Sequence, residues 1–96
     1  MQFSLLYSDD ANETLDRLEL ENANKSVKVL KALGYMQTNI KHPGLHTHAY
    51  AAREGKNGEK VFEAYVENHT PGAYRIYWHY GPGQGVITVL AITPHP

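Results

Sequence analysis

Histidine is the residue type whose abundance in this sequence first suggests chemistry. The chain has six His among 96 residues. Imidazole exchanges protons near neutral pH, so a well-placed His can act as an acid or a base. His79 and His95 are the two candidates for this role. The alternative is that His79 is a surface residue of a strand and His95 lies in a mobile tail.

A second pair, His46 and His48, has spacing that suits a metal ion. Residues two apart on a strand face the same way, so both rings could bind zinc if His42 or His69 supplied a third ligand. The chain has no Cys, which excludes thiolate ligands, disulfides and a thiol nucleophile. The spacing does not force a site, and we expect no native metal and no cofactor.

The stretch 74–80 alternates between two kinds of side chain, as a strand does. One face of this strand carries an aromatic and apolar stripe, namely Tyr74, Ile76, Trp78 and Tyr80. The other face carries Arg75, Tyr77 and His79. We expect the first face to lie in the core beneath helices. For Arg75 a purely structural alternative is an ion pair across the sheet with Glu63 or Glu67.

Two helices are predicted in the first part of the chain. A short apolar strand spans 2–7, and Asp9 or Asp10 can cap a helix over 11–21. Asn22 or Asn24 can cap a second helix. The apolar stripe predicted for that second helix is Val27, Leu30, Leu33 and Met36.

From Lys41 onward the pattern is that of strands and turns. Turns are predicted at 42–44, 56–58, 68–72 and 81–85, and strands at 46–53, 61–67, 74–80 and 86–92. The last strand is the most apolar and is expected to be central. We therefore predict a single α+β domain over 1–96. Its N-terminal strand and helical hairpin pack on one face of a mainly antiparallel sheet of four to five strands, whose other face is partly open to solvent.

Charge is nearly balanced overall but segregated along the chain. The net charge is −1, which argues against a generic polybasic nucleic-acid binder. Residues 1–24 hold six acids and one base, whereas residues 25–60 hold seven bases and two acids. No apolar segment is long enough to cross a membrane, and the start lacks the features of a signal peptide. We expect a soluble cytoplasmic protein.

The last third of the chain resembles a known family. Residues 73–80, a Gly-rich turn and residues 86–95 resemble the C-terminal hairpin of RelE/ParE-superfamily toxins of type II toxin–antitoxin systems. In these toxins a strand containing an Arg is followed by a turn and an apolar strand, and a His, Arg or Tyr lies just beyond it. The order of the predicted elements is also that of a RelE-like fold.

The resemblance implies a function and site residues. RelE-like members cleave mRNA on the ribosome without a metal, and ParE-like members poison DNA gyrase. By this resemblance Arg75 stabilises the phosphate in the transition state and His95 or His79 transfers protons. Tyr77 can stack on a base. The remaining RNA-binding candidates are Arg53, Lys56 and Lys60.

The same resemblance implies protein partners. A cognate antitoxin would wrap a helix or strand across the basic helix and the sheet face, and the ribosome with its mRNA would be the target. Lys25, Lys28 and Lys31 line one helix face, where they could meet ribosomal phosphates or an acidic antitoxin, or simply face solvent. The near-neutral charge also leaves open a non-catalytic member of the fold, either a gyrase inhibitor or a protein-binding module.

Overall fold

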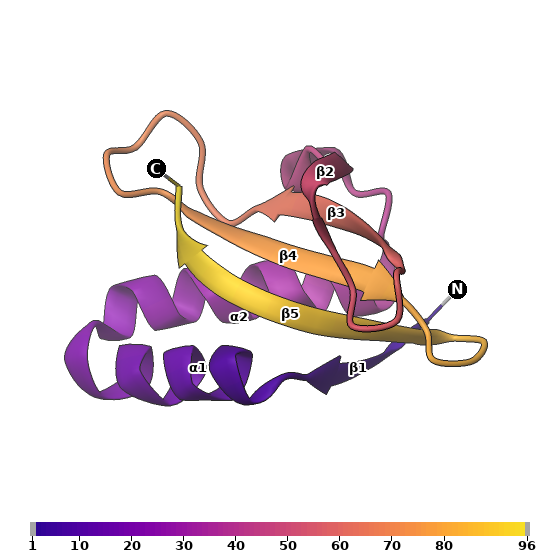
Figure 1. The fold of residues 1–96 in the computed structure, drawn as a ribbon. Coiled ribbons are helices and arrows are strands. Elements are labelled where there is room, and N and C mark those ends of the chain that lie inside the picture. Colours follow the sequence, from indigo (N-terminus) through magenta and orange to yellow (C-terminus); the bar gives the residue numbers. More distant parts are fainter. Residues whose placement is uncertain (1, 96) are drawn as a thin grey trace.

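Five strands form one mixed sheet, and two helices cover one of its faces (Figure 1). The computed structural model describes residues 2–95. The elements in chain order are β1 (Ser4–Tyr7), α1 (Asp9–Glu21), α2 (Ala23–Thr38), the short 3-10 helix η1 (Pro43–Leu45), β2 (His48–Glu54), β3 (Lys60–Tyr65), β4 (Tyr74–Tyr80) and β5 (Val86–Pro94). The strand order is β1-β5-β4-β3-β2, and only β1 pairs in parallel, with β5. The predicted α+β architecture is confirmed. β5 is an interior strand, but the central position expected for it is occupied by β4.

The helical hairpin begins and turns at residues whose side chains accept backbone hydrogen bonds. Asn22 caps α2, as one of the two predicted candidates, by accepting from the Lys25 amide at 3.1 Å. Asp9 and Asp10 lie within α1, so their prediction as caps is wrong. The cap is Ser8, because its hydroxyl oxygen accepts from the Ala11 amide at 3.0 Å. Among residues 2–95, neither helix is long and apolar enough to span a membrane.

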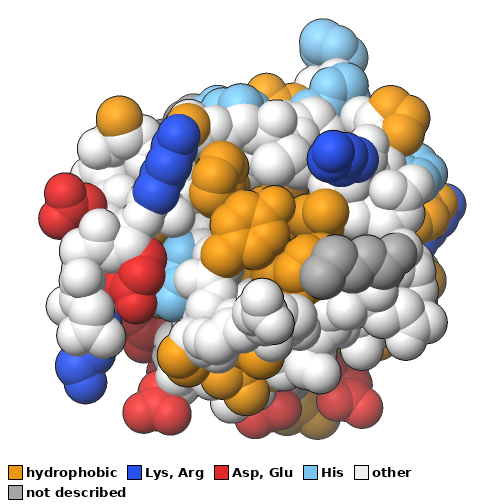
Figure 2. Space-filling view, turned by 90° about the vertical axis from the view of Figure 1, so that its right-hand side faces the viewer, with side chains coloured by type: hydrophobic (Ala, Val, Ile, Leu, Met, Phe, Trp, Pro, Cys, Tyr) orange, Lys and Arg blue, Asp and Glu red, His pale blue; other side chains and the backbone are white. Residues whose placement is uncertain are grey.

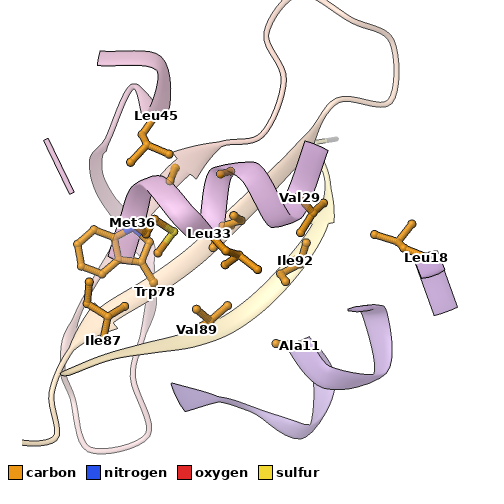
Figure 3. Packing of buried hydrophobic residues seen from close by; sticks show 13 residues of the cluster. Ala11, Leu18, Val29, Leu33, Met36, Leu45, Trp78, Ile87, Val89 and Ile92 are labelled. Atoms are coloured by element: carbon orange, nitrogen blue, oxygen red, sulfur yellow. The ribbon is translucent and has the colours of Figure 1, made fainter. Parts of the chain in front are cut away.

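The main core lies between the helices and the sheet (Figure 3). Trp78 and Ile76 of β4 are fully buried there, as their alternation predicted. The predicted stripe of α2 is only half right. Leu33 and Met36 are buried, but Val27 and Leu30 are 65% and 56% exposed. The buried face of α2 carries Val29, Ala32, Leu33 and Met36. These side chains belong to the core cluster that also contains residues of α1 and β5.

The second face of the sheet is closed, which corrects the expectation that it is partly open to solvent. Arg75, Tyr77 and His79 do lie on this face, but all three are buried. Figure 1 shows the reason: β2 and the loop after it curl in front of β4 and β5, on the side away from the helices. The Tyr50 ring of β2 packs on the Tyr77 ring with centroids 4.7 Å apart.

Ser8 gives a direct test of how the helices are fixed to the sheet. Besides capping α1, its hydroxyl donates to the Leu90 carbonyl at 2.6 Å, so one side chain joins the helix start to β5. We expect Ser8→Ala to lower the free energy of unfolding by about 1–2 kcal/mol. Urea denaturation measures this change. The exposed Ser4→Ala is the control, and an equal loss in both variants would contradict the role of the cap.

Candidate active site

A buried carboxylate, Glu63 of β3, is the centre of the polar cluster on the closed face. Its side chain is only 6% exposed. The Tyr77 hydroxyl donates to Glu63 Oε2 at 3.0 Å, and His48 Nε2 lies 2.6 Å from Oε1. These contacts follow from strand register, because Glu63 pairs with Tyr77 on β4 and with His48 on β2. A buried carboxylate held by two donors is a group that can exchange a proton with a ligand.

His48 is held at both ring nitrogens by oxygen acceptors. Nε2 faces the Glu63 carboxylate, and Nδ1 lies 2.8 Å from the His46 carbonyl oxygen. The tautomer of the ring decides which of these two oxygens accepts its N–H. The His48 side chain is 46% exposed. His48 therefore connects the buried carboxylate with the surface.

Arg75 lies on the other side of the same carboxylate. Its Nε is 3.8 Å from Glu63 Oε2, and its guanidinium lies over the Tyr65 ring at 3.7 Å. Nη1 donates to the carbonyls of Glu67, at 2.7 Å, and of Tyr74, at 3.3 Å. The buried Nε finds no hydrogen-bond acceptor among residues 2–95. Such an unpaired donor on a permanent cation is a place where an oxyanion gains hydrogen bonds.

The protonation of Tyr77 reflects this environment. Burial first, and then the hydrogen bond to the Glu63 carboxylate, raise the pKa of Tyr77 to about 12. An ordinary tyrosine has a pKa near 10. The phenol of Tyr77 therefore remains a hydrogen-bond donor to Glu63 at every physiological pH.

The two His residues predicted for proton transfer lie at opposite ends of β4. The His95 backbone amide donates to the Ala73 carbonyl at 2.7 Å, and Thr93 pairs with Arg75, so His95 is at the Arg75 end. His79 lies four residues from Arg75, which is about 13 Å along a strand. There its Nδ1 is 2.7 Å from the Tyr80 carbonyl oxygen and its Nε2 is 4.0 Å from Glu59. His95 and Arg75 thus lie at the same end of the β4–β5 pair, and His79 lies at the other end.

An open groove adjoins the cluster. A pocket of about 460 Å³ is lined by Tyr50, Ala52, Arg53, Tyr77, Thr93 and Pro94. It brings together two residues predicted to bind RNA, Arg53 and Tyr77, beside the strand end that carries His95. Lys56 is exposed in the loop after β2. Lys60 lies apart from this groove, because its ammonium sits over the Phe62 ring, at 5.5 Å from the centroid.

The middle of β2 covers the cluster without regular pairing. Ala49 pairs with Phe62 and Glu54 pairs with Lys60, so residues 50–53 bulge outward opposite Val61 alone. A bulge of this kind leaves backbone groups outside the ladder and bends the strand. It aims Tyr50 onto Tyr77. The cover over the cluster is therefore the least regularly paired part of the sheet.

Glu67 connects the Arg75 end of the cluster to α2. Its carboxylate accepts from Lys25 and, at 3.0 Å, from Lys28, while its carbonyl holds Arg75. Two of the three helix lysines thus pair within the protein. Burial alone would raise the pKa of Glu67, but the two lysine hydrogen bonds outweigh it and hold that pKa below its ordinary value.

The lowered pKa of Glu67 predicts a specific acid sensitivity. The stabilisation is complete above the ordinary carboxyl pKa of about 4.5 and is lost as pH falls through the lower pKa of the folded state, because the unfolded chain then binds the proton first. We expect Glu67→Gln to be less stable than wild type at neutral pH and to lose less on acidification. Urea midpoints between pH 3 and 7 measure this, with the exposed Glu19→Gln as control. If the urea midpoint depended on pH equally in wild type and Glu67→Gln, the stabilising role of the Glu67 contacts with Lys25 and Lys28 would be contradicted.

The His residues considered as metal ligands do not form a metal site in the described chain. Among residues 2–95, no group of three or more His, Asp or Glu side chains is arranged to hold an ion. Both nitrogens of His48 are already engaged, and the His42 ring stacks on Tyr35 with centroids 3.8 Å apart.

Sequence reasoning missed the central role of Glu63 and the contact of His48 with it. Glu63 was considered only as a partner of Arg75, and His48 only as a metal ligand. The available signal was alternation, since positions 61, 63 and 65 share one face of β3. It becomes informative only once the register of β3 against β2 and β4 is known.

Comparison with solved structures identifies the fold. A YoeB/ParE toxin from Agrobacterium tumefaciens superimposes with a TM-score of 0.73 at 7% identity, covering 98% of this chain and 100% of that one. The YoeB–YefM complex from Staphylococcus aureus gives 0.69 at 13%, covering both chains fully. The archaeal RelE–RelB complex from Pyrococcus horikoshii gives 0.67 at 15%, covering 98% and 96%. No protein-family model matches the sequence, and no curated protein does.

These likenesses define the class of fold. The neighbours are toxins of the RelE superfamily, and this chain has the RelE-like fold over its whole described length. The resemblance inferred from the C-terminal hairpin is thereby confirmed at the level of the fold. At 7–15% identity the comparison speaks for the fold alone.

Proposed function

We propose that this protein is the toxin of a type II toxin–antitoxin pair and inhibits translation in the cytoplasm by cleaving mRNA on the ribosome, without a metal. The observation that carries this proposal is the carboxylate of Glu63 set between the guanidinium of Arg75 and the imidazole of His48. On a RelE-like fold, this arrangement supplies a base and a phosphate-binding group within one cluster.

The chemistry is the transfer of a phosphodiester to its own 2′-hydroxyl. Glu63 accepts the proton of the 2′-hydroxyl, whose oxygen attacks phosphorus. The bond to the 5′-oxygen breaks, and an imidazolium returns a proton to that oxygen. Arg75 stabilises the charge on the phosphate through its unpaired Nε. The products are a 2′,3′-cyclic phosphate and a 5′-hydroxyl.

The proton donor of this mechanism is His95, which follows β5 at the end where β5 pairs with the start of β4. His95 is exposed there, on the strand end that pairs beside Arg75. His48 contacts Glu63 Oε1 at 2.6 Å, and its side chain is partly exposed. His79, about 13 Å along the strand, is the weaker of the two predicted proton donors.

Substrate access requires the cover to move. Glu63 and Arg75 are buried, and the bulged residues 50–53 of β2 lie over the cluster. We propose that RNA enters by the groove between Arg53 and Thr93 and displaces Tyr50 from Tyr77. A base can then stack on the freed Tyr77 ring, as its predicted role requires.

An antitoxin is the proposed protein partner. Two of the structural neighbours are RelE and YoeB in complex with RelB and YefM. On this chain Val27 and Leu30 of α2 are exposed and line one hollow together with Leu15 of α1. Exposed apolar residues that gather on one surface suit a protein partner.

Inducible expression in a bacterial host tests the toxin role. Wild type should arrest growth when no partner gene is present, and co-expression of the neighbouring short reading frame should relieve the arrest. His95→Ala should weaken the arrest, whereas His69→Ala, an exposed His in a turn, should leave it unchanged. Normal growth on expression of folded wild type would overturn the proposal.

A second candidate function is a non-catalytic protein of the same fold that binds gyrase or another protein. The burial of Arg75, with Nη1 engaged by two carbonyls, favours it. A DNA supercoiling assay separates the two functions. Inhibition of gyrase with ribosome-bound mRNA left intact would establish the second function in place of the first.

A further inference from the structure

A second pocket, at the far end of β4 from Arg75, combines aromatic walls with basic groups. It has a volume of about 410 Å³, and Phe62 and Tyr80 form its aromatic side. Tyr80 is 48% exposed although it is the last residue of a buried strand. Its ring also contacts Phe3, with centroids 5.8 Å apart. An exposed aromatic group of this size at a pocket is a surface on which a planar ring can stack.

The polar groups around this pocket are neutral or basic. Lys41, His42, His46 and Thr47 line it, and none of its lining residues within the described chain is acidic. Lys60 adds its ammonium over the Phe62 ring, at 5.5 Å from the centroid. The Gly44 amide donates to His42 Nδ1 at 3.0 Å, so the proton of the neutral His42 ring is on Nε2. The pocket thus offers hydrogen-bond donors and positive charge beside aromatic rings.

Figure 2 shows the end of the molecule where β1 begins and β4 stops. Hydrophobic side chains gather in the middle of this face, and a Lys or Arg side chain lies on either side of them. His side chains follow the upper rim, while acidic side chains are confined to the left and lower margins. A phosphate-bearing ligand with a planar base complements this distribution of charge and aromatic surface.

We propose that this pocket binds one nucleotide of single-stranded RNA, with the base stacked on Tyr80 and the phosphate held by Lys41 and Lys60. This inference rests on the proposed function, since the nucleotide belongs to the same RNA that the Glu63 cluster cleaves. It adds a binding site to which none of the predicted catalytic residues belongs.

The pocket and the Glu63 cluster lie on opposite faces of the sheet, since Phe62 packs on the core beneath the helices and Glu63 faces the other way. His46 and Thr47 line the pocket, and the next residue, His48, contacts Glu63. Phe62 in the pocket wall likewise precedes Glu63 on β3. The segment from His46 to His48 thus connects the pocket with the Glu63 cluster around the β2 edge of the sheet.

Binding of an uncleavable RNA tests this site. The probe is a fluorescein-labelled pentanucleotide of 2′-O-methyl RNA, titrated with protein and followed by fluorescence anisotropy. Tyr80→Leu retains apolar packing against Phe62 but removes the stacking surface, and we expect roughly ten-fold weaker binding. Lys41→Glu should weaken binding to a similar extent and flatten its salt dependence. Arg17→Glu, the same charge change on exposed α1, should bind like wild type.

The outcomes separate this inference from the proposed function. Thermal melting first verifies that each variant is folded. Weakened binding by both Tyr80→Leu and Lys41→Glu supports the site, even if wild type fails to cleave the 2′-hydroxyl form of the same RNA. Wild-type affinity in both variants overturns the site, whether or not cleavage occurs. Self-association of wild type that Tyr80→Leu abolishes would also overturn it, by assigning the patch to a second copy of the chain.

Discussion

Arg75→Ala is expected to reduce the rate of mRNA cleavage on the ribosome by a factor on the order of 10²–10³. The guanidinium lies beside the Glu63 carboxylate, with Nε 3.8 Å from Oε2, and it stays charged throughout the physiological pH range. Its Nε has no hydrogen-bond acceptor in the described chain. Removing it eliminates the group that meets the charge developing on the phosphate. Single-turnover cleavage of ribosome-bound mRNA measures the loss.

Two further variants show whether the loss is chemical. Arg75→Lys keeps the charge but loses the planar fork, so it should recover only part of the rate. Arg17→Ala, on exposed α1, should cleave like wild type. Because Arg75 is buried against Tyr65, each variant is first compared by urea denaturation. Full activity in a folded Arg75→Ala would show that the guanidinium only supports the structure.

Glu63→Gln is expected to reduce cleavage by a factor on the order of 10²–10⁴, because an amide cannot accept the proton of the 2′-hydroxyl. The same change should lower the pKa of Tyr77 from about 12 toward 10, since the Glu63 carboxylate contributes to raising it after burial. Ultraviolet titration of tyrosinate measures this, and Tyr77→Phe identifies the transition that belongs to Tyr77.

The combination of these two readouts separates catalysis from folding. A folded Glu63→Gln variant with a lowered Tyr77 pKa and lost cleavage supports Glu63 as the base. Retained cleavage with the same shift in pKa would contradict that role, because the cluster would have changed without consequence for the reaction. Glu54→Gln, at the exposed end of β2, is the matched control for both measurements.

The fold was largely predictable because local patterns determine its elements. Alternation over 74–80 places Ile76 and Trp78 in the core and Arg75 on the opposite face, as the structure confirms. The stripe of α2 was harder to predict. Leu30 fits a helical period, yet it is exposed, because the direction from which α1 and β5 approach decides which side of α2 is covered.

The candidate site was only partly predictable, since it depends on contacts between distant strands. The proximity of His48 to Glu63 follows from the register of β2 against β3, which no local pattern specifies. The closure of the sheet face follows from the bulge at 50–53, which brings Tyr50 onto Tyr77. Alternation places Arg75 on the correct face of the sheet, but alternation alone does not predict that Arg75 is buried there.

The end groups of mRNA fragments test the central claim most directly. Ribosome-bound mRNA is incubated with purified protein in EDTA-treated buffer, with magnesium restored only to the level that ribosomes need, and the new ends are analysed chemically. The mechanism predicts 2′,3′-cyclic phosphate and 5′-hydroxyl ends, absent with Arg75→Ala. Intact mRNA in the presence of folded wild type, or fragments with 5′-phosphate ends, would contradict it.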